Sequence, residues 1–134
     1  MKNTLVTVGS IITMALGVVS AISVFIVAAV LPELLASVDS SFYNGITPDE
    51  FEVILGSYLV LQGIIFLVAG LALGGVSLLV NLDVIKMKKP EVLILIFGIV
   101  IIAFVNALAG ILMIVGRSQY LNQKKSNSEA NPSN

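Results

Sequence analysis

The sequence predicts an all-α membrane protein with three transmembrane helices in a compact bundle. Hydrophobic residues make up 57% of the 134 residues and charged residues only 11%, whereas soluble domains carry about 25% charged residues. A chain of this size cannot bury so much apolar surface internally, because small folds leave a large share of their surface exposed. A lipid bilayer accommodates that surface, so the composition favours a membrane environment.

The spacing of charged residues divides the chain into three long apolar segments. A helix of about 20 apolar residues crosses a hydrocarbon core of about 30 Å, and open strands are excluded because lipid leaves their backbone groups unpaired. We do not expect a helical hairpin in the third segment, because about 25 residues are too few for two full crossings. We expect spans near residues 5–31, 55–82 and 92–116, which fall in uncharged stretches.

The first span is expected to be retained rather than cleaved as a signal peptide, because its apolar run is far longer than the hydrophobic core of a signal peptide, which has about 7–15 residues. The second helix is expected to begin near Pro48, since Thr47 and Glu50 match a capping box. The short basic loop 83–91 makes the second and third helices an antiparallel hairpin. Residues 1–121 then form the transmembrane domain, and the polar tail 122–134 is expected to be disordered.

The two predicted loops differ strongly in charge. The loop 32–54 contains five acidic residues and no basic one, while the loop 83–91 contains three lysines. Cytoplasmic loops carry an excess of Lys and Arg. We therefore expect a plasma-membrane protein with its N-terminus and loop 83–91 in the cytoplasm and the acidic loop 32–54 outside. Three spans would then leave the C-terminus outside, although the tail is itself basic.

Small residues recur along one face of each predicted helix. Association of helices in lipid relies on close packing, which small residues permit. Within the second helix, Gly70 and Gly74 form a GxxxG match, which indicates either packing inside one chain or a dimerisation surface. We expect the first of these, because two neighbouring helices are available in the same chain. The candidate packing residues are Gly56, Gly63, Gly70, Gly74 and Ser77 in the second helix, Thr13, Gly17 and Ser20 in the first, and Gly110 in the third.

Gln62 and Asn106 are the most polar side chains deep in the predicted spans. We expect them to form interhelical hydrogen bonds; the alternative is that they line a path for a solute. Both amides are neutral and do not relay protons as a carboxylate or a histidine does.

Several classes of function are disfavoured by the residues that the sequence lacks. It contains no His and no Cys, so neither a Ser-His-Asp set nor a typical zinc site is available. No charged residue lies inside a predicted span, whereas coupled transporters usually keep one at membrane depth. The net charge of −1 argues against a nucleic-acid partner. We therefore expect no enzymatic activity, no cofactor and no metal.

The layout of the chain resembles that of a group of uncharacterised small multi-pass membrane proteins from Gram-positive bacteria. The resemblance rests on the basic start Met1-Lys2-Asn3-Thr4, the glycines Gly9 and Gly17, the acidic run 49–52, and Lys88-Lys89-Pro90. That group has no assigned activity, so the resemblance implies a bacterial membrane protein and no site residues.

Two main functions remain open. The first is a non-catalytic protein that acts through helix–helix or protein–protein contacts, as an accessory subunit or an immunity-type protein. Its partner would be another membrane protein or a further copy of the chain. The alternative is an oligomeric channel or an uncoupled transporter of a small solute. A weaker third option is an envelope protein whose acidic loop senses the outer surface.

Overall fold

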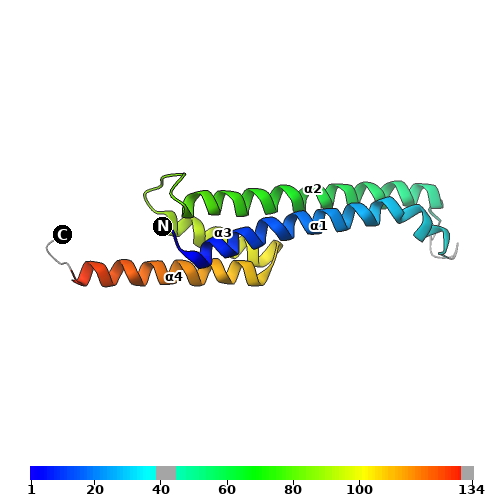
Figure 1. Cartoon of the computed structure of the whole chain (residues 1–134). Coiled ribbons are helices and arrows are strands. Elements are labelled where there is room, and N and C mark those ends of the chain that lie inside the picture. Colours follow the sequence, from blue (N-terminus) through cyan, green and yellow to red (C-terminus); the bar gives the residue numbers. More distant parts are fainter. Residues whose placement is uncertain (39–44, 131–134) are drawn as a thin grey trace.

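The computed structural model describes residues 1–38 and 45–130, and these residues form four helices joined by short connections (Figure 1). The helices are α1 (Thr4–Ala36), α2 (Pro48–Asn81), α3 (Pro90–Phe104) and α4 (Ala107–Ala130). The prediction of an all-α protein is confirmed. Two of these helices, α1 and α2, are long and apolar enough to cross a membrane, while α3 is apolar but shorter.

The helices α1 and α2 form a long antiparallel pair, and α3 and α4 form a shorter hairpin that lies along half of it (Figure 1). The main partner of α3 is α4, and α4 also packs on α1. The predicted contact between the second and third helices exists but is minor. Val6, Ile94, Ile101, Ala109 and Met113 form the buried core where α1 meets the hairpin.

The ends of the two long helices follow from their capping residues. The Thr47 side chain accepts a hydrogen bond from the Glu50 amide, and the Glu50 carboxylate accepts one from the Thr47 amide. This capping box, predicted from the sequence, satisfies two donors that a helix start leaves unpaired. At the start of α1, the Asn3 side chain accepts hydrogen bonds from the amides of Leu5 and Val6. Pro32 lies inside α1 and does not end it.

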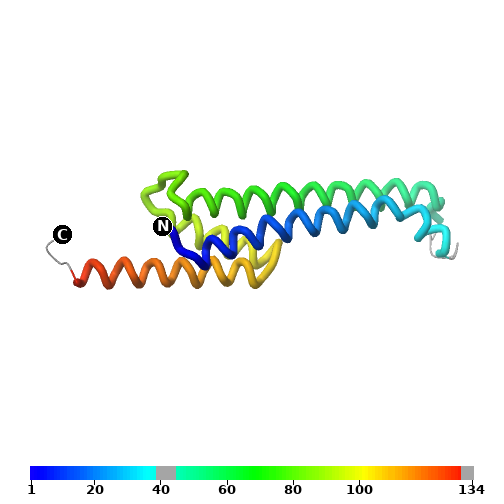
Figure 2. The backbone as a smooth tube through the Cα atoms, viewed as in Figure 1, coloured from blue at the N-terminus to red at the C-terminus, as the bar shows by residue number. Residues whose placement is uncertain are grey.

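The expected third span, residues 92–116, is wrong as a single helix. The helix is interrupted between Phe104 and Ala107, where the chain reverses direction, as the yellow part of the tube in Figure 2 shows. The amides of Val105 and Asn106 both donate to the Ile101 carbonyl oxygen at 2.9 Å, which closes α3. The Asn106 side chain then accepts from the Ala109 amide at 3.2 Å and starts α4, because asparagine is a strong helix N-cap.

The expected disorder of the tail also needs correction. The helix α4 continues to Ala130, so residues 122–130 are helical, while residues 131–134 lie outside the described part of the chain. The physical reason is local, because Gln, Lys, Leu and Glu favour helix and no Gly or Pro interrupts them before Pro132.

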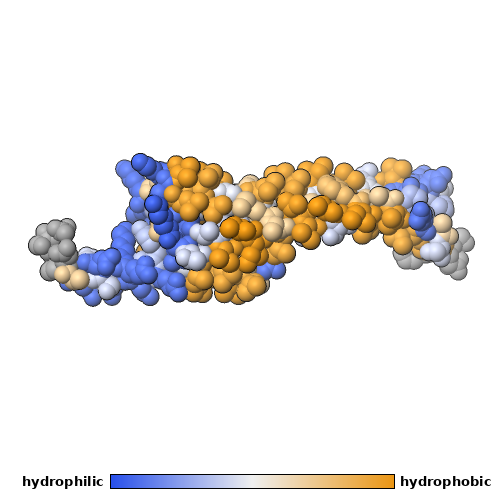
Figure 3. Space-filling model, viewed as in Figure 1, coloured by the Kyte–Doolittle hydropathy of each residue, from blue (hydrophilic) through white to orange (hydrophobic). Residues whose placement is uncertain are grey.

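The reversal at residues 105–106 brings three segments to one end of the molecule. The N-terminus, the connection after α2 and the projecting part of α4 all lie at that end (Figure 2). All seven basic residues belong to these segments: Lys2, Lys86, Lys88, Lys89, Arg117, Lys124 and Lys125. Between this end and the opposite one, the visible surface is mostly apolar (Figure 3).

Candidate functional site

The helices α1 and α2 pack closely where they cross. A Cβ atom added to Gly70 would lie 2.7 Å from the Cα of Gly17, and one added to Gly17 would lie 2.7 Å from the Cα of Gly70. One turn further along α2, a Cβ on Gly74 would lie 2.7 Å from the carbonyl oxygen of Ser10. We call Gly17, Gly70 and Gly74 the glycine seam. Only hydrogen side chains allow the two backbones to approach so closely.

The seam continues in both directions with residues that the sequence pattern also singled out. Toward the end of the pair that the hairpin leaves uncovered, the Phe25 ring covers Gly63, while Gly56 makes only ordinary contact with Leu31. Ser20 is half-buried in α1. Thus α2 directs its glycine stripe toward α1 of the same chain, and the Gly70–Gly74 motif is occupied by an intramolecular contact.

Three hydroxyl side chains are fully buried next to the glycine seam. The Thr13 hydroxyl donates to the Gly9 carbonyl oxygen at 2.8 Å, one turn back in its own helix. The hydroxyls of Ser10 and Ser77 have no hydrogen-bond partner among the described residues. The small volume of serine explains these two positions better than its polarity does, because they lie where the helices are closest.

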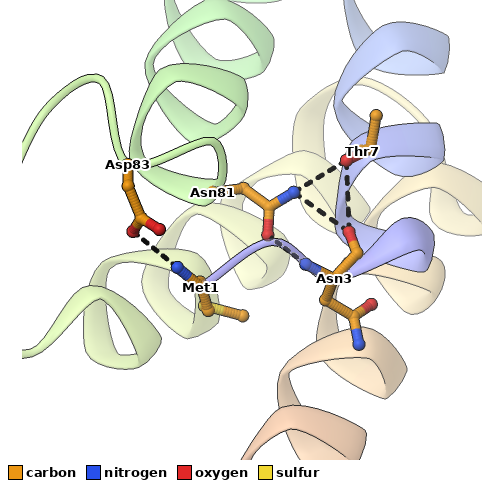
Figure 4. A network of polar contacts seen from close by, with 5 residues as sticks. All are labelled: Met1, Asn3, Thr7, Asn81 and Asp83. Atoms are coloured by element: carbon orange, nitrogen blue, oxygen red, sulfur yellow. Dashed lines mark hydrogen bonds and ion pairs between the residues drawn. The ribbon is translucent and has the colours of Figure 1, made fainter.

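A buried polar network, formed by Asn3, Thr7 and Asn81, closes the seam at the basic end of the molecule (Figure 4). We call it the asparagine network. The Asn3 amide donates to the Asn81 side-chain oxygen at 2.9 Å. The Asn81 side-chain nitrogen donates to the Asn3 carbonyl oxygen at 3.0 Å and to the Thr7 hydroxyl at 2.7 Å. Asn81 is fully buried, and its amide pairs as a buried polar group must.

An exposed ion pair lies beside the asparagine network. The ammonium group of Met1 contacts the Asp83 carboxylate at 2.6 Å (Figure 4). The hydrogen bond from this ammonium lowers the pKa of Asp83 below its usual value, and the positive charges of Met1, Lys2 and Lys86 act in the same direction. Desolvation of the carboxyl group opposes the shift. A depressed carboxyl pKa stabilises the fold above the ordinary pKa of Asp, and that contribution disappears as the pH falls through the lowered pKa.

The helix α4 joins this end of the α1–α2 pair through further glycines. A Cβ on Gly9 would lie 2.7 Å from the Ala109 carbonyl oxygen, and a Cβ on Gly116 would lie 2.5 Å from the Asn3 side-chain oxygen. Asn3 therefore contacts three helices at once. The sequence pattern missed Asn3 and Gly116 as packing residues. The available signal for Asn3 was its position before an apolar run, where asparagine is a favoured N-cap.

The hairpin contains a second close approach. A Cβ on Gly110 would lie 2.5 Å from the Gly98 carbonyl oxygen, so these glycines set the separation of α3 and α4. Asn106, expected to bond another helix, instead caps α4 through Ala109. Gln62 is half-buried and has no described hydrogen bond. Neither side chain therefore forms the expected interhelical hydrogen bond among the described residues.

The polar groups of the described residues hold helices together and do not form a constellation for chemistry. Among residues 1–38 and 45–130, no three Asp or Glu side chains gather as metal ligands would. Arg117 donates a hydrogen bond to the Glu91 carbonyl oxygen at 2.8 Å and so links α4 to the first turn of α3. The contacts that define this site are packing contacts.

Comparison with known proteins gives no match to a family model, to a curated protein or to a solved structure. The resemblance to small membrane proteins of Gram-positive bacteria stays a prediction, and the function must be argued from the geometry.

Proposed function

We propose that this chain is an integral membrane protein that acts through helix–helix contacts, as an accessory subunit or an immunity-type protein, and that it performs no catalysis. The main support is the apolar exterior of α1 and α2. Val53, Ile26 and Val68 are 67%, 58% and 60% exposed, although both helices are long enough for a bilayer. Exposure of such an apolar surface to water is unfavourable, whereas contact with lipid or a partner helix removes it from water.

The proposed topology has two spans and one re-entrant hairpin. The apolar part of α3, residues 92–104, is about 20 Å long at about 1.5 Å per residue, which is too short for a core of about 30 Å. The hairpin then enters and leaves on the same side. The close contact between Gly98 and Gly110 supports this arrangement, because it fixes α3 and α4 as antiparallel neighbours.

This topology places the basic residues on one side of the membrane. All seven basic residues lie on one side, and the acidic loop 32–54, with five acids and no basic residue, lies on the other. The positive-inside rule then assigns the N-terminus, the loop 83–89 and the C-terminus to the cytoplasm. A continuous third span would instead divide the basic residues between the two sides.

Reporter fusions test the topology. A fluorescent protein fused after Asn134 is expected to fold and fluoresce, and alkaline phosphatase at the same position is expected to be inactive. The matched control is a fusion after Gly45, where only the phosphatase should be active. An active phosphatase after Asn134 would show that the third segment crosses fully and that the re-entrant topology is wrong.

An uncoupled channel or transporter is the second candidate, and the helix break at residues 105–106 favours it. Non-helical backbone at membrane depth is tolerated where it is buried in protein or lines a water-filled cavity. Proteoliposomes containing the protein should then pass glycerol faster than empty ones. Gln62→Leu should reduce that flux if Gln62 lines the path. Because the Gln62 side chain has no described hydrogen bond, this substitution should leave the fold intact. Equal flux in loaded and empty liposomes would eliminate this candidate.

A further inference from the structure

An open groove lies where the basic loop 83–89 meets the start of α3. It has a volume of about 490 Å³ and is lined by Met87, Lys88, Lys89, Val92, Leu93 and Ile96. We call it the lysine groove. Two of its lining residues are cationic and the other four are apolar. A site that combines an apolar wall with a few charged groups suits an amphipathic ligand.

The two lysine side chains of the groove are free to bind an anion. Both residues are exposed, and neither ammonium group has a hydrogen bond or an ion pair among the described residues. Asp83 is paired with the ammonium group of Met1 instead. Glu91 does not line the groove, and one of its carboxylate oxygens is buried. No carboxylate of the described residues therefore neutralises the two lysines.

The lysine groove extends from the membrane surface into the bilayer. This inference rests on the membrane location proposed above, which places the loop 83–89 at the surface and α3 in the hydrocarbon. Ile96 follows Lys89 by seven residues, so it lies about 10 Å deeper along α3 at about 1.5 Å per residue. A phospholipid would place its phosphate at the lysines and the first part of an acyl chain along Val92 and Ile96, which are 43% and 52% exposed.

A groove of similar size at the opposite end of the molecule has the opposite charge. Its volume is about 520 Å³, and it is lined by Ile46, Asp49, Glu50, Val53 and Ile54. Both grooves have apolar walls, so their charged residues must decide which headgroup each one accepts. Lysines attract a phosphate headgroup, whereas carboxylates repel it. We propose that the lysine groove is a binding site for an anionic phospholipid.

The thermal stability of the purified protein in detergent micelles tests this proposal. Dioleoylphosphatidylglycerol should raise the Tm by about 3 °C or more, because a ligand that binds only the folded state stabilises it. Dioleoylphosphatidylcholine, which has no net charge, and inorganic phosphate, which has no acyl chain, should have little effect. An equal shift with phosphatidylcholine would show that the headgroup is not selected. An equal shift with inorganic phosphate would identify a free anion as the ligand, and either result would overturn the proposal.

Two charge-matched double variants test whether the lipid binds at the groove. Lys88→Gln with Lys89→Gln should abolish the Tm shift, because each lysine near a membrane surface contributes about fivefold to the affinity for anionic lipid. Lys124→Gln with Lys125→Gln removes the same charge from two adjacent exposed lysines of α4 and should retain the shift. Equal loss in both variants would indicate general attraction to the basic end of the molecule and would overturn the proposal.

Quenching of a single tryptophan tests the position of the acyl chain, because the protein contains no native tryptophan. In liposomes, Ile96→Trp should bind brominated phosphatidylglycerol at least about fivefold more strongly than brominated phosphatidylcholine. The control is Val68→Trp, which is 60% exposed on α2 and should be quenched equally by the two lipids. Equal quenching by the two lipids at Ile96→Trp would contradict an anionic lipid in the lysine groove.

The reporter fusion after Asn134 and an alkaline carbonate wash of the membranes separate this inference from the proposed function. A cytoplasmic C-terminus without preference for anionic lipid would refute the lipid site and leave the re-entrant topology intact. A C-terminus outside with the preference retained would refute the re-entrant hairpin and support the lipid site, because the loop 83–89 lies at the surface in both topologies. Release of the protein by the wash would refute the membrane location and the lipid site together.

Discussion

Replacing Gly70 with alanine is expected to lower the stability of the folded helix pair by about 1–3 kcal/mol, the usual range for overpacking. The added methyl group would lie 2.7 Å from the Gly17 Cα and 3.2 Å from the Thr13 carbonyl oxygen. Both are backbone atoms, which no side-chain rotation moves away. The two helices must separate along the glycine seam, and the contacts of Gly74 are then lost as well.

Gly75→Ala is the matched control for this prediction. A Cβ on Gly75 would meet only the Met14 sulfur at 3.9 Å, an ordinary contact. Alanine also favours helix by about 1 kcal/mol relative to glycine, so this variant should be as stable as the wild type or slightly more stable. Both effects are read as the Tm of a fluorescent fusion in detergent micelles, followed by size-exclusion chromatography. Equal Tm values for the two variants would show that α1 and α2 do not cross at Gly17 and Gly70.

The glycine seam is a part of this fold that can be predicted from the sequence alone. A stripe of small residues at helical spacing marks the face of α2 that meets a neighbour, because side chains at such spacing share one face. The capping box at Thr47 and Glu50 was similarly visible, since its two partners are only three residues apart. In both cases the pattern lies within one helix, so it can be recognised without knowledge of the tertiary structure.

The helix break at Asn106 depends on information that is not local. A single asparagine in a long apolar run is compatible with a continuous membrane helix, so counting uncharged residues predicts a span over 92–116. The break instead depends on Gly98 and Gly110 packing against each other after the reversal. The length of the third apolar segment excludes only a hairpin with two full crossings, and a re-entrant hairpin makes no full crossing.

The asparagine network combines both kinds of information. Asn81 continues the small-residue stripe of α2 and is predictable as an interface residue from its spacing. Its partner Asn3 lies 78 residues away in the sequence, and only the antiparallel register of α1 and α2 brings the two together. Because each asparagine satisfies groups of the other helix, the network selects this register over a shift by one turn.

Asn81→Ala is expected to lower stability by about 2–3 kcal/mol, because the buried Asn3 amide loses its acceptor and the Thr7 hydroxyl loses its donor. Disruption of the network should also loosen α4, since Asn3 lies against Gly116. Hydrogen exchange should therefore become faster at both ends of the network, in residues 3–7 and around Gly116, and remain slow around Gly63.

The control for this last prediction is Asn122→Ala, in the exposed part of α4, which should leave the free energy of unfolding within about 0.5 kcal/mol of the wild-type value. Asn81→Asp gives a further discrimination. The aspartate keeps the oxygen that accepts from the Asn3 amide but loses the donor to the Asn3 carbonyl and to Thr7. It should be at least as unstable as Asn81→Ala, because it adds a buried charge without a partner. Wild-type stability in Asn81→Asp would mean that the amide donates no hydrogen bond to α1 and that the helix register differs from the one described.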